Sequence, residues 1–314
     1  MSASSSRTRQ CFDSSRYSNG CGSQRGLVLR GVTFVVLLAC AGPSMAAQKP
    51  VDAAPIPQII HRPPDRSTLT SDQKKAETNV AKILAHAQGA LQVGDYGSAA
   101  ANYKDALEIF EQAYGPTHER LAEPLSGIVN VRLTQYVTEK VGRGHPALSI
   151  LKAAAEAQKR IVDIYDGAKG IDPVQHVDAK ITLGDLYLYI PDNARGVASY
   201  RDAYQLQARL VSPESAEEMF SQIKMINLFL PANPPSHDEW EIKVAFDVAP
   251  DGRLSVVDYQ SNANQNLNRF MRDAYGEARA RPRFVNGEPV KSELMASYVY
   301  RTNSDITIRA VQPR

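Results

Sequence analysis

The stretch from residue 94 to residue 118 constrains the fold most, because it contains a turn, an amphipathic helix and a helix stop in that order. Gly94-Asp95-Tyr96 is a turn signal. Apolar side chains follow at steps of three and four, which places them on one helix face: Ala99, Tyr103, Ala106, Leu107 and Phe110. The small alanines let a second helix approach closely, and Gly115-Pro116 ends the helix.

The same positions recur twice further along the chain. Gly94, Ala99, Tyr103 and Ala106 map onto Gly142, Ala147, Leu151 and Ala154 at a shift of 48 residues, and onto Pro191, Gly196, Tyr200 and Ala203 after a further 49. The third copy adds Leu183-Gly184 and Tyr187 in the preceding helix. This spacing resembles the tetratricopeptide repeat (TPR), which implies helix pairs stacked into a solenoid. The alternative is an unrelated domain of amphipathic helices.

Helical periodicity extends from Thr70 to about Leu230. Ser71 opens the first helix of this region. Ser212-Pro213-Glu214 opens a last one, which we expect to run through Met219, Ile223 and Ile226. This last helix would cap the open end of the stack.

The apolar period changes to two after Pro234-Pro235. Alternation of Trp240, Ile242, Val244, Phe246 and Val248 predicts a buried strand face, with Trp240 in the core. A Pro250-Asp251-Gly252 turn leads to a return strand over 254–259. Residues 262–279 then carry an apolar helical stripe, and an Asn286-Gly287 turn precedes a strand over 294–300. The order predicts a helix packed on an antiparallel sheet.

These pieces, in this order, resemble the TonB C-terminal domain. The resemblance rests on the Asp251-Gly252 turn, on Arg281-Pro282-Arg283-Phe284 and on Gly287-Glu288-Pro289-Val290. It implies a sheet whose edge strand adds a short peptide of an outer-membrane receptor. The candidate edge is Ser297, Tyr298, Val299, Tyr300 and Arg301. The alternative is that residues 305–310, which alternate, form a terminal strand covering this edge.

The N-terminal region predicts export. Arg25 and Arg30 precede an apolar run over 32–41, and small residues lead to Ala46. This pattern predicts a signal peptide over 1–46. Leu37-Leu38-Ala39-Cys40 also resembles a lipobox, so lipidation at Cys40 is the alternative, and only in that case do we expect membrane attachment. The proline-rich residues 47–69 predict an extended linker.

Charge and cysteine content argue against several classes of function. The chain has 36 Lys+Arg and 34 Asp+Glu, a net charge of +2, and five Arg with one Asp precede residue 47, which leaves −2 for the remainder. A nearly neutral chain has no electrostatic footprint for nucleic acid. All three cysteines precede residue 47, so we expect neither disulfides nor thiol chemistry in the exported part.

Motifs for catalysis are missing from the sequence. The histidines are scattered, and no nucleotide-binding or hydrolase fingerprint occurs. His118, His145 and His176 lie near predicted helix starts, where they suit turns or caps. Arg279, Arg281 and Arg283 alternate, either as a phosphate-binding face or as a solvated strand rim. We therefore expect no metal, no cofactor and no enzymatic activity.

Together these features predict an α+β multidomain protein. An all-α TPR-like solenoid spans 70–230, a linker follows over 231–239, and a small antiparallel α+β domain resembling the TonB C-terminal domain spans 240–314. We expect a periplasmic protein of a Gram-negative bacterium that binds proteins or peptides, receptor segments among them, through two tethered modules. The alternatives are a lipidated envelope scaffold, in which the last domain only packs on the solenoid, and a non-catalytic subunit of an envelope enzyme.

Overall fold

The computed structural model describes residues 67–143, 146–229, 239–300 and 306–311, all within one compact unit from Met45 to Arg314. The predicted signal peptide, Cys40, His145, most of the proline-rich linker and residues 231–238 lie outside the described residues. The described part combines a large helical region with a small antiparallel sheet near the C-terminus. The α+β layout predicted from the sequence is therefore confirmed.

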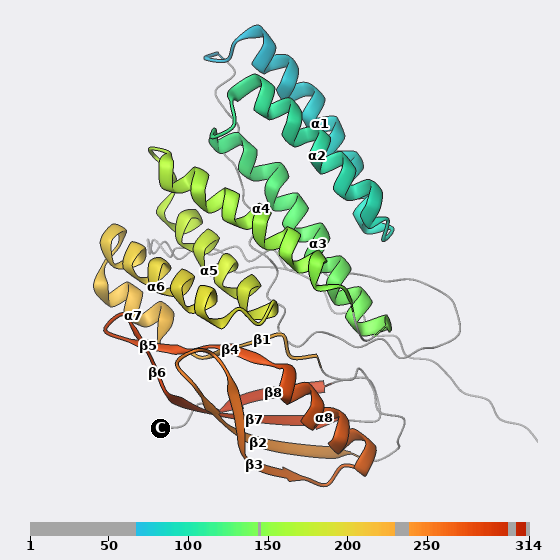
Figure 1. Cartoon of the computed structure of the whole chain (residues 1–314), viewed down its shortest axis with the longest axis vertical. Helices are drawn as coiled ribbons and strands as arrows, with labels where there is room; N and C mark the ends of the chain where they lie inside the picture. Colours follow the sequence, from blue (N-terminus) through green and yellow to red (C-terminus); the bar gives the residue numbers. More distant parts are fainter. Residues whose placement is uncertain (1–66, 144–145, 230–238, 301–305, 312–314) are drawn as a thin grey trace, which may run out of the picture. The chain divides into compact units, whose positions relative to one another are not determined.

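Consecutive helix hairpins make up the helical region (Figure 1). The pairs are α1 (Ser71–Gln92) with α2 (Tyr96–Tyr114), α3 (Ala122–Arg143) with α4 (Leu148–Gly167), and α5 (Pro173–Tyr189) with α6 (Asn193–Leu210); the short η1 (Glu119–Leu121) precedes α3, and α7 (Pro213–Phe220) follows α6. Each helix packs chiefly on its neighbours in sequence. Helix pairs that stack one upon the next produce this pattern of contacts.

Side chains just before the helices explain where they begin. Thr70 and Gln73 form a capping box at the start of α1. The carboxylates of Asp95 and Asp192 accept amide hydrogens from the first turns of α2 and α6. Gly94 has a φ of 77°, which glycine adopts without strain, so the first hairpin can turn sharply there.

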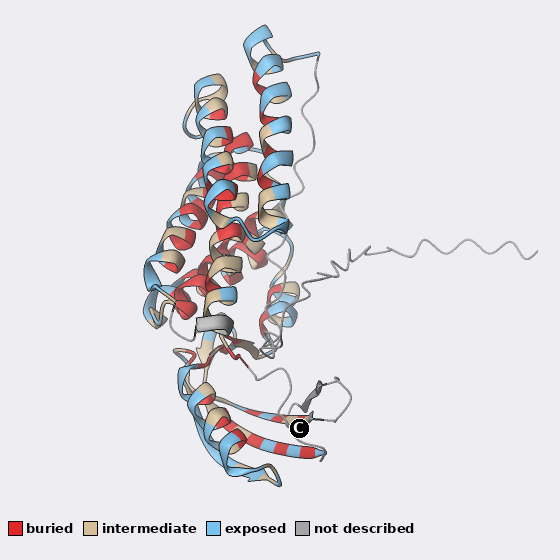
Figure 2. Cartoon of the chain, turned by 90° about the vertical axis from the view of Figure 1, so that its right-hand side faces the viewer, coloured by how far each residue is buried: buried red, intermediate tan, exposed pale blue. Residues whose placement is uncertain are grey.

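The C-terminal sheet has the strand order β3-β2-β7-β8 and is antiparallel throughout. Its strands are β2 (Trp240–Val248), β3 (Leu254–Ser261), β7 (Ser292–Tyr300) and β8 (Ile306–Val311). Buried and exposed residues alternate along β2, and Figure 2 shows this alternation in the sheet. The helix α8 (Gln265–Glu277) covers the buried face with Leu267, Met271 and Tyr275. Trp240 is 5% exposed and belongs to this core, as predicted.

The segment after α7 differs from the prediction. The expected helix through Ile223 and Ile226 is wrong, because α7 ends at Phe220. Instead, β1 (Lys224–Ile226) pairs antiparallel with β4 (Arg279–Arg281). The backbone groups of this segment find their hydrogen-bond partners in the C-terminal region, and this long-range pairing overrides the local helical period.

A small hairpin follows β4. It consists of β5 (Arg283–Val285) and β6 (Glu288–Val290), which pair antiparallel. Asn286 and Gly287 connect them with φ values of 52° and 81°. Such left-handed conformations are typical of an Asn-Gly turn, so the turn predicted here is confirmed.

The candidate edge strand is covered. β7 pairs with β2 on one side and with β8 on the other, and Ser297, Tyr298, Val299 and Tyr300 lie opposite Arg309, Ile308, Thr307 and Ile306. Arg301 lies outside the described residues. Of the two possibilities that the sequence leaves open, the structure has the covered edge and not the open edge at residues 297–300. The terminal strand covers it because an unpaired edge leaves backbone donors and acceptors without partners.

Candidate interaction surfaces

A buried ion pair joins the C-terminal region to the last helix hairpin. Arg281, at the end of β4, donates from Nη2 to both carboxylate oxygens of Asp185 on α5, at 3.0 and 3.3 Å. The Tyr200 hydroxyl on α6 donates to the same carboxylate at 2.6 Å. The guanidinium carbon of Arg281 lies 5.1 Å from the centroid of the Tyr200 ring. These contacts leave the Arg281 side chain only 9% exposed.

The environment of this pair keeps the Tyr200 hydroxyl protonated. Burial, together with the neighbouring Asp185 carboxylate, raises the pKa of Tyr200 well above its usual value, so the hydroxyl keeps its proton. Lys224 Nζ on β1 lies 3.9 Å from the Asp185 carboxylate. Arg281 is thus neither part of a phosphate-binding face nor on a solvated rim, and both predictions for it are wrong. Its partner is an acidic side chain of the helical region.

An aromatic cluster lies beside the ion pair. Phe284, from β5, is fully buried and contacts Tyr204 and Phe220 at ring-centroid distances of 6.1 and 5.4 Å. The Asn286 backbone N–H donates to Glu217 Oε1 on α7, and the Tyr204 hydroxyl donates to the same oxygen at 2.8 Å. The β5–β6 hairpin therefore rests on α6 and α7.

Three further contacts complete this junction. The β2–β3 turn lies close to β4 and to α5. A Cβ at Gly252 in this turn would be 2.5 Å from the Ala280 carbonyl oxygen and 3.5 Å from the Leu188 side chain. At the rim, Lys140 pairs with Glu277 at 2.7 Å and Arg201 pairs with Glu288 at 2.8 Å. The C-terminal region thus touches α3, α5, α6 and α7, which answers a question that the sequence leaves open, namely whether the two modules are in contact.

Most repeat-defining residues are buried between helices. This applies to Ala99, Tyr103, Ala106, Leu151, Ala154, Gly184, Tyr187, Tyr200 and Ala203. Gly184 and Tyr200 come together: a Cβ on Gly184 would lie 2.4 Å from Cε1 of the Tyr200 ring. The glycine lets the aromatic ring lie against the backbone of α5.

The second repeat unit departs from the pattern at its turn. Gly142 lies within α3, and Ala147 is the exposed N-cap of α4 instead of a buried helix residue. The expectation that these two residues match Gly94 and Ala99 is wrong. α4 begins further beyond Gly142 than α2 begins beyond Gly94. Only the later positions of this unit, Leu151 and Ala154, are buried like their counterparts in the other two units.

One close contact was missed from the sequence. A Cβ on Gly127 of α3 would lie 2.1 Å from Cε1 of Tyr103 on α2. As at Gly184 and Tyr200, a helix glycine leaves room for a tyrosine ring. Here, however, the two helices belong to successive hairpins. An isolated glycine inside the apolar helix pattern was the available signal, since it indicates close approach of another group.

Half-buried polar side chains lie along the helices α3 and α5. On α3, Arg132 Nη1 donates to Gln135 Oε1 and Gln135 Nε2 donates to Glu139 Oε1, both at 3.0 Å. On α5, burial raises the pKa of the Asp178 carboxyl. Apart from Thr138, no described residue from Leu121 to Lys140 is fully exposed. These two helices therefore carry polar groups that are only partly solvated.

Two of the described histidines, His118 and His176, have structural partners. His118 Nδ1 accepts the Arg120 amide hydrogen and thereby caps η1, as predicted. His176 lies inside the first turns of α5, and its Nε2 is 2.7 Å from Asp166 Oδ1. Lys180 pairs with the same carboxylate at 2.8 Å. Burial lowers the pKa of His176 although the Asp166 hydrogen bond opposes this shift, so the ring is neutral near pH 7.

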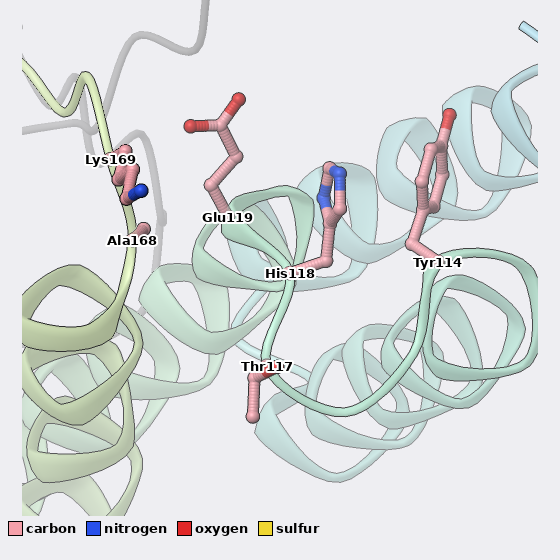
Figure 3. Close-up of a pocket in the computed structure, with 6 residues that line it drawn as sticks. All are labelled: Tyr114, Thr117, His118, Glu119, Ala168 and Lys169. Atoms are coloured by element: carbon pink, nitrogen blue, oxygen red, sulfur yellow. The ribbon is translucent and has the colours of Figure 1, made fainter.

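An open pocket of about 360 Å³ lies next to His118 (Figure 3). Its lining comprises Tyr114, Thr117, His118, Glu119, Ala168 and Lys169. Thr117 points to the opposite side of the loop from His118, Glu119 and Tyr114. These polar groups do not converge on one point in the pocket.

Over the described ranges, no three His, Cys, Asp or Glu side chains gather where they could hold a metal ion. None of the helices in the described residues has the length and apolar character needed to cross a membrane. The sequence matches no protein-family model and no curated protein.

Proposed function

We propose that this protein is an exported adaptor of the bacterial cell envelope that binds protein partners non-covalently. The carrying observation is the docking of a sheet module onto the last of three stacked helix hairpins. Stacked helix pairs offer an extended surface for partners, and here the partly buried polar side chains of α3 and α5 supply groups to recognise them.

The finer identities of the two regions belong to this proposal. The close packing of Gly184 against Tyr200 supports a TPR-like solenoid. The β2–β3 hairpin, followed by α8 and then by β7 next to β2, supports a module related to the TonB C-terminal domain. β8 covers β7, which removes the open strand on which an outer-membrane receptor peptide was expected to dock. The proposal therefore keeps the adaptor role without energised transport.

A lipidated scaffold is the second candidate. The observation that favours it is the packing of the C-terminal region on α5 and α6, because a scaffold needs a fixed module. Mass spectrometry of the mature N-terminus separates the two candidates. Cleavage near residue 46 supports a soluble periplasmic adaptor, whereas a lipid-modified N-terminal Cys40 supports the anchored scaffold.

Site-specific photo-crosslinking in the full-length protein tests the adaptor role. A photoreactive amino acid replaces exposed Thr138 on α3 or Met295 on the outer sheet face, the latter 48% exposed. Lys159, on the exposed side of α4, is the matched control. We expect discrete adducts with envelope proteins from position 138 or 295 and none from position 159. Illumination that yields no discrete adduct at either test position would contradict the proposal.

A further inference from the structure

The last helix hairpin has an apolar face that its own helices do not cover. Leu188 on α5 is fully buried and Tyr204 on α6 is 8% exposed; Phe220 on α7, also fully buried, packs in the same cluster. Their cluster includes Phe284, which comes from the C-terminal region. In a stack of helix pairs, the terminal pair has no next pair to cover it, so a stable stack needs a cap.

We infer that the strands β1, β4 and β5 are the cap of the helical stack, and that Arg281, Asp185 and Tyr200 form a latch that makes the stack and the sheet one cooperative folding unit. This inference goes beyond the adaptor proposal. It concerns how the helical stack and the sheet are held together, and it can fail even if the proposed partner binding is correct.

The connectivity of the cap supports the inference. β1 follows α7 directly, and it pairs with β4, which belongs to the C-terminal module. The helical region thus contributes a strand to the module, and the module contributes Phe284 to the core of the helical region. Neither part completes its hydrogen bonds and its core without the other.

The latch adds specificity to this apolar contact. Arg281 and Lys224, one on each strand of the β1–β4 pair, both face the Asp185 carboxylate. Asp185 also accepts the Tyr200 hydroxyl, which ties both helices of the hairpin to the same charge. When one member of a buried ion pair is removed, the other is left as a buried charge without compensation. The ion pair therefore specifies one docked geometry, because an arrangement that buries Arg281 or Asp185 without the other is disfavoured.

Urea unfolding of the mature protein followed by two probes tests the inference. Trp240 is the only tryptophan and lies in the sheet core, so its fluorescence reports on the module. Far-UV circular dichroism reports mainly on the helices, which dominate the described chain. We expect the two signals of the wild-type protein to change with one common midpoint. Separate midpoints in the wild type would overturn the inference.

Two variants sharpen the test. Arg281→Met should lower the Trp240 midpoint by about 1 M urea and separate it from the helical transition. The milder Phe284→Leu should act in the same direction. Arg201→Met removes a more exposed arginine from the same junction and should leave both transitions coincident and almost unshifted. If Arg281→Met and Phe284→Leu behave like Arg201→Met, the latch does not exist.

Discussion

Replacing Gly184 by alanine should destabilise the protein although it improves helix propensity. In a helix interior, alanine is usually favoured over glycine by about 0.5–1 kcal/mol. At Gly184, however, the added Cβ would lie 2.4, 2.7 and 2.9 Å from three atoms of the Tyr200 ring. Carbon atoms pack best at about 3.5–4.0 Å, so the ring must move.

The Tyr200 ring has little freedom to move. It is fully buried, and its hydroxyl is held by Asp185 at 2.6 Å while Arg281 lies over its face. Overpacking of a well-packed core costs about 1–3 kcal/mol. Because the shift would also disturb these polar contacts, we expect Gly184→Ala to lower the free energy of unfolding by roughly 1–3 kcal/mol.

Urea unfolding monitored by circular dichroism measures this effect. Gly89→Ala is the matched control, because Gly89 also lies in a helix interior but has no atom within 4 Å of the added Cβ. It should stabilise the protein by about 0.5–1 kcal/mol. In a Tyr200→Ala background, the cost of Gly184→Ala should disappear. A Gly184→Ala variant as stable as Gly89→Ala would refute the argument.

Three further perturbations test other buried contacts of the protein. Phe284→Ala should lower the free energy of unfolding by about 3–5 kcal/mol in urea titrations, whereas Val257→Ala, at a position 58% exposed, should change it by less than about 0.5 kcal/mol. Arg120→Met leaves the partly buried Glu77 carboxylate without its ion pair and should cost about 3–5 kcal/mol in the same assay; Lys75→Met, from an exposed pair, should cost almost nothing. The folded-state pKa of His176 lies below its usual value of 6.5, so the unfolded chain binds the proton more tightly and stability should fall as pH decreases through about 6.5. His176→Gln should flatten that part of the stability–pH curve measured by thermal unfolding, and an unchanged slope would exclude His176 as its source.

Local patterns predicted the elements well where neighbours in sequence decide the structure. The Asp251-Gly252 and Asn286-Gly287 turns and the alternating β2 strand were predicted, because turn chemistry and burial on one face act over a few residues. Gly184 and Tyr200 were found because repeat spacing carries information on packing between paired helices.

Contacts between distant segments were not predictable in this way. β1 has three residues, and only its pairing with β4 distinguishes it from the end of a helix. The Arg281–Asp185 pair joins residues 96 positions apart, and nothing in the local alternation indicates that partner. Whether residues 305–310 cover the sheet edge also remained open, since an edge strand and a covered strand share the same alternation.

The central claim is that the C-terminal module is docked on the last helix hairpin. Nuclear Overhauser effects between the ring protons of Tyr204 and Phe284 test it directly, in mature protein with only Phe and Tyr rings protonated. The stacked rings, 6.1 Å apart at their centroids, should give clear cross-peaks that vanish in Phe284→Leu. Assigned resonances of both rings without any cross-peak between them would contradict the docked arrangement.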